Sequence, residues 1–140
     1  MMRILAPAAA AALLALAGPV LAAPMPVETA FRFKVARAGG GLALMWTAAP
    51  GHYLYRDRFE AATLDGRAIT LVTPPGESKD DPNFGSTEVY HGHVTITLGA
   101  GAAPARGALR VTYQGCAENG FCYAPVTKRI DLRTLQVGAE

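Results

Sequence analysis

The 140-residue chain lacks the features of several common functional classes. Its 13 lysine and arginine residues nearly balance its 11 aspartate and glutamate residues, and no basic cluster is interleaved with aromatic residues, so nucleic-acid binding is not expected. Beyond the N-terminal segment, no apolar run approaches the length of about 20 residues that crosses a bilayer. There is no internal repeat, and the two cysteines allow at most one internal disulfide.

The N-terminal segment has the pattern of a secretory signal peptide. It reads MMRILAPAAAAALLALAGPVLA, with Arg3 before an apolar run and small residues before the expected cleavage site after Ala22. We therefore predict that residues 1–22 are removed and that the protein is exported to an oxidising compartment, where two cysteines can pair. Residues 23–29 are expected to form a flexible arm, and the remainder suits a single domain.

The rest of the chain alternates apolar and polar residues in short runs between turn signals. The run AFRFKVA, residues 30–36, is followed by three glycines, Gly39 to Gly41, and by the run GLALMWTA, so these two runs are expected to form a hairpin. Period-two alternation with frequent turns predicts an all-β sandwich, with a small barrel as the alternative. The predicted domain spans residues 30–135, and residues 136–140 are expected to be a C-terminal tail.

The stretch STEVYHGHVTITL, residues 86–98, allows two interpretations. It is either one strand that continues through Gly92 or a hairpin that turns at His91–Gly92. In a strand, His91 and His93 share a face, which makes copper binding a weak alternative function. Their spacing matches no strong metal motif, so exposed polar positions are the simpler interpretation.

Both cysteines lie in the stretch YQGCAENGFCYAP, residues 113–125. Between them, Asn119-Gly120 is a strong turn dipeptide, so Cys116 and Cys122 are expected to face each other at the ends of two adjacent late strands. Closing a loop of about seven residues contributes roughly 2.4 kcal/mol in chain-entropy terms, and less where a turn already joins the strands. Structural pairing is the commoner role in exported β domains, but this pair makes a poor staple and a good candidate for exchange.

The local sequence does not indicate how either thiol would be activated. No histidine or lysine lies within four residues of Cys116 or Cys122, and Glu118 disfavours a nearby thiolate. The acidic residues Asp80 and Asp81 are expected to be solvated, or to form a rim that faces a partner, rather than to act in acid–base catalysis. A strongly lowered thiol pKa is therefore not predicted.

Three segments of the chain match segments of one known family in the same order. YQGCAENGFCYAP resembles the pattern Y-Q-G-C-x-x-x-G-F-C-Y-x-P. GHYLYRDRF, residues 51–59, is similar to a G-x-Y-L-Y-R segment, and FGSTEVYHG, residues 84–92, is similar to an F-x-G-x-x-E-V-Y segment. The family that these segments resemble is the N-terminal, periplasmic domain of the thiol:disulfide interchange protein DsbD, and the resemblance extends over about residues 30–132.

This resemblance implies an immunoglobulin-like sandwich in the periplasm, whose cysteine pair cycles between dithiol and disulfide. By matching position, Cys122 is expected to attack a partner's disulfide and Cys116 to resolve the mixed disulfide. The residues expected to cap or surround the pair are Tyr53, Tyr55, Asn83, Phe84, Phe121 and Tyr123. The expected partners are thioredoxin-like periplasmic proteins, such as disulfide isomerases and cytochrome c maturation thioredoxins, with a membrane electron donor; no metal or other cofactor is expected.

Two departures from the family pattern affect this expectation. The family has two adjacent aromatic residues before a glycine, the first of which caps the cysteines, whereas here Asn83 takes the first position and Phe84 the second. Either Phe84 caps the pair after a loop shift that Pro82 stabilises, or the cap is weaker. The chain also stops at Glu140, so it resembles a free-standing N-terminal domain, expected to be a monomer that receives electrons in trans.

A hypothesis from another functional class is a non-enzymatic, immunoglobulin-like binding module with a structural disulfide. It predicts a reduction potential below about −300 mV, whereas an exchanging pair lies between roughly −200 and −270 mV. A periplasmic copper-binding protein is the third and weakest alternative.

Overall fold

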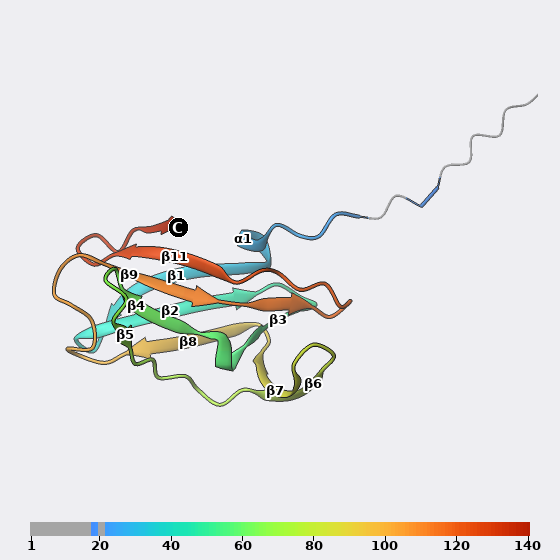
Figure 1. Ribbon diagram of the computed structural model, residues 1–140, viewed down its shortest axis with the longest axis horizontal. Helices are drawn as coiled ribbons and strands as arrows, with labels where there is room; N and C mark the ends of the chain where they lie inside the picture. The colour runs from blue at the N-terminus through green and yellow to red at the C-terminus, as the bar shows by residue number, and fades with distance from the viewer. Residues whose placement is uncertain (1–17, 20–21) are drawn as a thin grey trace, which may run out of the picture.

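The computed structural model describes residues 18–19 and 22–140, most of which lie in β-strands (Figure 1). The remaining residues of the expected signal peptide, 1–17 and 20–21, lie outside the described residues. Within the described part of the chain, no helix has both the length and the apolar character needed to cross a membrane.

The chain forms twelve strands, one short α-helix and one 3-10 helix in the described residues. In chain order these are α1 (Val27–Ala30), β1 (Phe31–Ala38), β2 (Gly41–Ala48), β3 (His52–Tyr55), η1 (Arg56–Arg58), β4 (Glu60–Thr63), β5 (Ala68–Ile69), β6 (Glu77–Asp81), β7 (Gly85–Tyr90), β8 (His93–Leu98), β9 (Ala108–Tyr113), β10 (Gly115–Ala117), β11 (Val126–Asp131) and β12 (Val137–Ala139). They build three sheets with the orders β1-β2-β8, β10-β3-β7-β6 and β12-β11-β9-β4-β5.

The main core lies between the three-stranded and the five-stranded sheets. Trp46 of β2 is fully buried there, stacked on Phe33 at 4.4 Å between ring centroids and meeting Tyr113 of β9 edge-on at 5.4 Å. Leu44 of β2 and Ile130 of β11 belong to the same buried cluster. Apolar side chains on the inner faces of two sheets are the hallmark of a sandwich, so the predicted all-β, immunoglobulin-like sandwich is confirmed.

The predicted first hairpin forms with β1 and β2 paired along their whole length, from Phe31–Ala48 to Ala38–Gly41. Its two turn residues, Gly39 and Gly40, both have positive φ angles, of 54° and 76°. Glycine adopts this backbone conformation without the steric cost that other residues incur, so the glycine run fixes the turn and the register of the pair.

Both sequence-based interpretations of residues 86–98 are wrong. Strand β7 ends at Tyr90 and pairs with β3 and β6, whereas β8 begins at His93 and pairs with β2 in a different sheet. Between them, Gly92 has a φ of 62°, and its carbonyl accepts a hydrogen bond from the Ala48 N–H at 2.8 Å. The chain therefore changes sheet at His91–Gly92, because β8 pairs with β2, far away in sequence, and not with β7.

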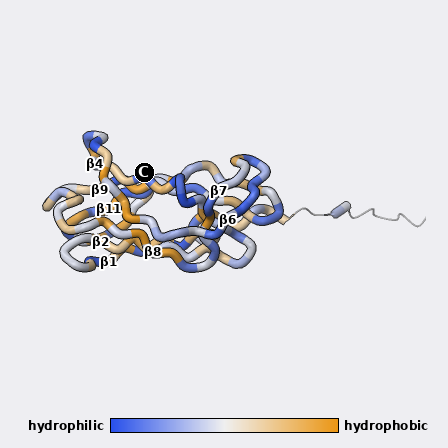
Figure 2. Tube along the Cα trace, turned by 90° about the horizontal axis from the view of Figure 1, so that it is seen from below, coloured by the Kyte–Doolittle hydropathy of each residue, from blue (hydrophilic) through white to orange (hydrophobic). Residues whose placement is uncertain are grey.

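The four-stranded sheet carries a second, smaller buried cluster of Tyr53, Tyr55, Val89, Cys116 and, partly buried, Cys122. This sheet includes the β6–β7 hairpin, which lies beside the end of the sandwich in Figure 1. Strand β6 is largely hydrophilic in Figure 2, whereas β8 is largely hydrophobic. The cysteine pair thus lies in a small cluster of its own, covered by a polar hairpin.

Ordered structure extends into both segments that flank the predicted domain. Helix α1 begins at Val27, within the segment expected as an arm, and the carbonyl of Met25 accepts a hydrogen bond from the Tyr123 hydroxyl at 2.7 Å. Strand β12 lies within the segment expected as a tail and pairs with β11, with Ile130 opposite Val137.

Candidate functional site

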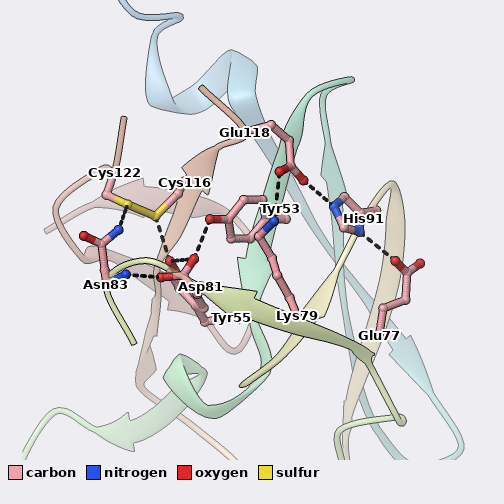
Figure 3. A network of polar contacts seen from close by, with 10 residues as sticks. All are labelled: Tyr53, Tyr55, Glu77, Lys79, Asp81, Asn83, His91, Cys116, Glu118 and Cys122. Carbon is pink, nitrogen blue, oxygen red and sulfur yellow. Dashed lines mark hydrogen bonds and ion pairs between the residues drawn. A yellow bond between two sulfur atoms is a disulfide. The ribbon is translucent and has the colours of Figure 1, made fainter. Parts of the chain in front are cut away.

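Cys116 and Cys122 face each other, as the sequence predicts, and form a disulfide (Figure 3). The strand that carries Cys116, β10, pairs with β3 instead of with a neighbouring late strand. Cys116 lies opposite Tyr53 in that pairing, and Cys122 lies opposite Cys116 in an isolated bridge, with the two Cα atoms 4.0 Å apart. Glycine is needed just before Cys116, because a Cβ at Gly115 would lie 2.5 Å from Cζ of Phe31 and would also collide with the Tyr53 carbonyl. Only the bare backbone lets β10 approach β3 so closely.

The loop between the cysteines is the tight turn that Asn119-Gly120 predicts. The N–H of Ala117 donates to the carbonyl of Phe121 at 2.7 Å, and the N–H of Phe121 donates to Oδ1 of Asn119 at 3.1 Å. Gly120 has a φ of 96°, a conformation that glycine adopts readily. These backbone contacts join the two arms of the loop without the sulfur atoms, so the disulfide orders little chain that is not already ordered.

The two sulfur atoms have unequal surroundings. Cys116 is fully buried, and its Sγ lies 3.0 Å from the hydroxyl of Tyr55. Cys122 is half-buried, and its Sγ accepts a hydrogen bond from Nδ2 of the exposed Asn83 at 3.2 Å. A thiol or disulfide of another protein can therefore approach Cys122 much more readily than Cys116.

Asp81, at the end of β6, connects the cysteines to the hairpin that covers them (Figure 3). Its Oδ2 accepts hydrogen bonds from the hydroxyls of Tyr53 at 2.6 Å and Tyr55 at 2.7 Å. Its Oδ1 accepts hydrogen bonds from the backbone N–H groups of Asn83 at 2.8 Å and Phe84 at 3.1 Å. A single carboxylate thus fixes two tyrosines of β3 and the turn that places Asn83 on the sulfur.

The hydrogen bonds of this network determine its protonation state. Burial disfavours the Asp81 anion, but the two tyrosine hydroxyls and the two backbone donors outweigh burial and hold the pKa of Asp81 below its ordinary value. Burial, followed by the hydrogen bond to Asp81, raises the pKa of Tyr53 to about 12, and the same two causes raise the pKa of Tyr55. At neutral pH, Asp81 is therefore charged and both tyrosines are protonated.

The Tyr55 hydroxyl has one proton and two neighbours, Asp81 Oδ2 and Cys116 Sγ. When Cys116 leaves as a thiolate, this hydroxyl can turn its proton to the sulfur, while the Tyr53 hydroxyl continues to donate to Asp81. When Cys116 is a thiol, its S–H can donate to the Tyr55 oxygen instead. The buried sulfur thus has a partner in both protonation states, which limits the cost of burying it.

The expectation that Asp81 is solvated, or part of a rim, is wrong. Asp81 is only 4% exposed, whereas its neighbour Asp80 is exposed as expected. The local sequence carried one usable signal, because an aspartate followed by Pro82 is typical of the first position of a turn. That signal predicts the hydrogen bonds to the next backbone groups, but it does not predict burial against two tyrosines.

The other expected cap residues contact the pair indirectly. Phe84 is 41% exposed, packs edge-on against Tyr55 at 4.8 Å and lies under the guanidinium of Arg58 at 4.3 Å. Phe121 is 42% exposed and packs against Tyr123 at 4.9 Å. Tyr123 is buried in the main core, so Tyr53, Tyr55 and Asn83 are the predicted residues that the structure brings into the polar network around the sulfurs.

A cluster of charged residues lies on the other side of Tyr53 (Figure 3). Glu118, in the cysteine loop, accepts hydrogen bonds from Nζ of Lys79 at 2.9 Å and pairs with Nε2 of His91 at 2.8 Å, while Nδ1 of His91 pairs with Glu77 at 2.8 Å. Lys79 also lies over the ring of Tyr53, 4.7 Å from its centroid. Glu118 was expected to oppose a thiolate, and nothing near it in the sequence indicates that it pairs with Lys79 and His91.

We predict that an NMR titration of His91 gives a pKa above the ordinary 6.5, because its hydrogen bond to Glu118 is the largest influence and Glu77 adds to it, against a smaller effect of burial. Protonated His91 stabilises the folded state through its pairs with Glu118 and Glu77. This contribution is complete when the pH is below the pKa of His91 in the unfolded chain, and it is lost as the pH rises through the higher pKa of His91 in the folded protein. Glu118→Gln should lower the pKa of His91, and the exposed Glu60→Gln should not. An unchanged pKa in Glu118→Gln would contradict this pairing.

His91 and His93 do not form the shared ligand pair on which the copper hypothesis depends. His91 contacts Glu77 and Glu118, whereas Nδ1 of His93 is 2.8 Å from the hydroxyl of Thr47, its neighbour on β2. In residues 18–19 and 22–140, no group of three histidine, cysteine, aspartate or glutamate side chains has an arrangement suited to a metal ion.

Comparisons with known proteins agree with this geometry. The family model for "Thiol:disulfide interchange protein DsbD, N-terminal" matches residues 22–134. The chain is 45% identical over 109 residues to thiol:disulfide interchange protein DsbD 2 of Pseudomonas aeruginosa, covering 77% of this chain and 18% of that protein. It is 34% identical over 112 residues to DsbD of Cronobacter sakazakii, covering 80% and 20%. The chain thus spans about a fifth of the length of these curated relatives.

Two solved structures match this chain over more than nine-tenths of their own length. The crystal structure of the reduced DsbD N-terminal domain of Neisseria meningitidis superposes with a TM-score of 0.71 at 32% identity, covering 82% of this chain and 94% of that one. A complex of the DsbD and PilB N-terminal domains from the same organism contains a chain that superposes with a TM-score of 0.65 at 31% identity, covering 81% and 91%. This chain belongs to the family of DsbD N-terminal domains.

Proposed function

We propose that this protein carries out thiol-disulfide exchange in the periplasm, passing two electrons at a time through Cys116 and Cys122. The observation that carries the proposal is the unequal environment of the two sulfurs, one buried against Tyr55 and one half-buried beneath Asn83. An exchanging pair needs one sulfur that a partner can reach and one that completes the reaction inside the protein. Membership of the DsbD N-terminal family supports the same function.

In this proposal Cys122 is the attacking thiol. Its thiolate displaces one sulfur of a partner's disulfide, so that a mixed disulfide forms and the partner's first thiolate leaves. Cys116, deprotonated in turn, then attacks Cys122 Sγ, the mixed disulfide breaks, and the partner's second thiolate leaves. The partner has gained two electrons and the Cys116–Cys122 disulfide has formed. Tyr55 lies where it can take part in the proton movements at Cys116.

The proposed partners are thioredoxin-like proteins of the periplasm. The N-terminal domain of DsbD from Neisseria meningitidis has been solved in complex with the N-terminal domain of PilB, which supports a protein partner for this fold. A membrane electron donor that restores the dithiol is part of the proposal, as is the export signal at residues 1–22.

A redox titration tests the function against the alternative of a structural bridge. We expect the Cys116–Cys122 pair to equilibrate with glutathione or dithiothreitol at a potential between roughly −200 and −270 mV, because the turn already joins its two arms and the disulfide adds little stability. The fraction reduced is read as the mass added by a thiol-alkylating reagent, and the double variant Cys116→Ser, Cys122→Ser, which has no thiol, is the blank. A potential below about −300 mV would instead identify a structural disulfide and reject the proposal.

A further inference from the structure

The accessible sulfur accepts a hydrogen bond from an amide side chain. Nδ2 of Asn83 donates to Cys122 Sγ at 3.2 Å, across 39 positions of sequence (Figure 3). The family pattern has an aromatic residue at this position, the first of two before a glycine. This chain departs from that pattern at Asn83. Phe84, which keeps the second aromatic position, packs on Tyr55 instead.

The backbone that carries the amide is held independently of the disulfide. Oδ1 of Asp81 accepts the backbone N–H groups of Asn83 and Phe84, and this closes the turn that follows β6. Pro82 lies between Asp81 and Asn83, and its ring fixes φ at the second position of the turn. Neither restraint includes a sulfur atom, so the turn that presents the amide to Cys122 does not require the disulfide.

Nearby carboxylates oppose an anion at Cys122, but their charges are engaged elsewhere. Asp81 accepts four hydrogen bonds from tyrosines and backbone, and Glu118 pairs with Lys79 and His91. No lysine, arginine or histidine side chain among the described residues is hydrogen-bonded to Cys122. The Asn83 amide is therefore the group placed to stabilise a negative charge on that sulfur.

We propose that Asn83 is a positioning residue for exchange, whose side-chain amide hydrogen-bonds Cys122 Sγ and favours its thiolate in place of the shielding that an aromatic cap provides. The physical reason is that an N–H donor bonds a thiolate more strongly than a thiol, so it favours the charged form. The inference rests on the proposed function, because the thiolate of Cys122 is the nucleophile in that reaction. An aromatic ring at this position would cover the sulfur but donate nothing.

The test measures the thiol alone, without a partner protein. In the Cys116→Ser protein, Cys122 is the single thiol, and the pH dependence of its alkylation by iodoacetamide gives its pKa. Asn83→Leu keeps a similar volume but removes the donor, and we expect the pKa to rise by about one unit, or about tenfold less thiolate at a given pH. Asn83→Asp, which replaces the donor by an anionic acceptor, should raise the pKa at least as far.

Two further variants separate the hydrogen bond from other effects. Asn83→Phe should both raise the pKa and slow alkylation at every pH, because the ring shields the sulfur as well as lacking the donor. Gln136→Leu is the matched control: it removes another exposed side-chain amide, from the segment between β11 and β12, and should leave the pKa of Cys122 unchanged.

An unchanged or lowered pKa in both Asn83→Leu and Asn83→Asp would overturn the inference. If replacing Cys116 prevents folding, the same curve is obtained from the reduced parent by mass spectrometry of the peptide that contains Cys122. The two proposals fail separately, because a structural-range redox potential rejects exchange, whereas alkylation reports only on the amide and the sulfur.

Discussion

Replacing Cys122 by serine is expected to abolish the formation of a mixed disulfide, and replacing Cys116 by serine is expected to trap it. The reduced variants would be incubated with an oxidised thioredoxin-like domain and separated on a non-reducing gel. Cys116→Ser should accumulate a covalent complex, because its Cys122 can attack but this protein has no second thiol that can displace the partner and re-form the Cys116–Cys122 disulfide. Cys122→Ser should yield none, because the remaining thiol is fully buried against Tyr55.

The two serine variants are matched controls for each other. Each loses the same disulfide, whose loop-closure contribution is at most about 2.4 kcal/mol, so loss of the disulfide cannot explain a difference in trapping. Equal trapping by both variants would mean that the buried sulfur reaches a partner as readily as the half-buried one. That result would contradict the assignment of the attacking and resolving roles.

The parts of the fold that could be predicted are those fixed by neighbouring residues. Hairpin β1–β2 was predictable because both strands alternate and Gly39 and Gly40 supply the positive φ angles of its turn. The turn at Asn119-Gly120 was predictable for the same reason, and with it the meeting of the two cysteines. In each case the two strands or arms are joined directly by the turn, so a local signal determines which segments pair.

The parts that escaped prediction depend on partners far away in sequence. Asp81 is buried because Tyr53 and Tyr55, 28 and 26 positions earlier, donate to it, and nothing beside Asp81 in the sequence specifies this. The change of sheet at His91–Gly92 likewise follows from the choice of β2 as the partner of β8. At Asn83 the expectation was either that Phe84 takes over the capping or that the cap is weaker, because a missing ring is visible in a sequence and a hydrogen bond to a distant sulfur is not.

The contacts at the site also explain how the β6–β7 hairpin is attached to the rest of the domain. Strand β6 contributes Lys79 to the pair with Glu118 of the cysteine loop, and Asp81 to the two tyrosines of β3, the strand that pairs with Cys116. The polar groups of β6 depend on being satisfied together, because a buried polar group without a partner is costly. The stability of the hairpin and the position of Asn83 are therefore linked through Asp81.

Replacing Asp81 by alanine is expected to lower the free energy of unfolding by about 3 kcal/mol, because two buried hydroxyls and two backbone N–H groups lose a charged acceptor. Urea denaturation at neutral pH measures the loss. Asp80→Ala is the matched control, since the neighbouring side chain is exposed, and should change stability by no more than about 0.5 kcal/mol. Similar losses in both variants would show that the Asp81 network does not hold the hairpin.

The pH dependence of the same experiment identifies the carboxylate as the cause. The pKa of Asp81 is lower in the folded protein than its ordinary 3.8, so the folded state binds the proton less readily than the unfolded state. The stabilisation by Asp81 is therefore complete at pH values above 3.8 and is lost as the pH falls through the lower folded pKa. The stability difference between the parent and Asp81→Asn should shrink over that acid range, because asparagine does not titrate. A difference that stays constant with pH would assign the effect to packing instead of charge.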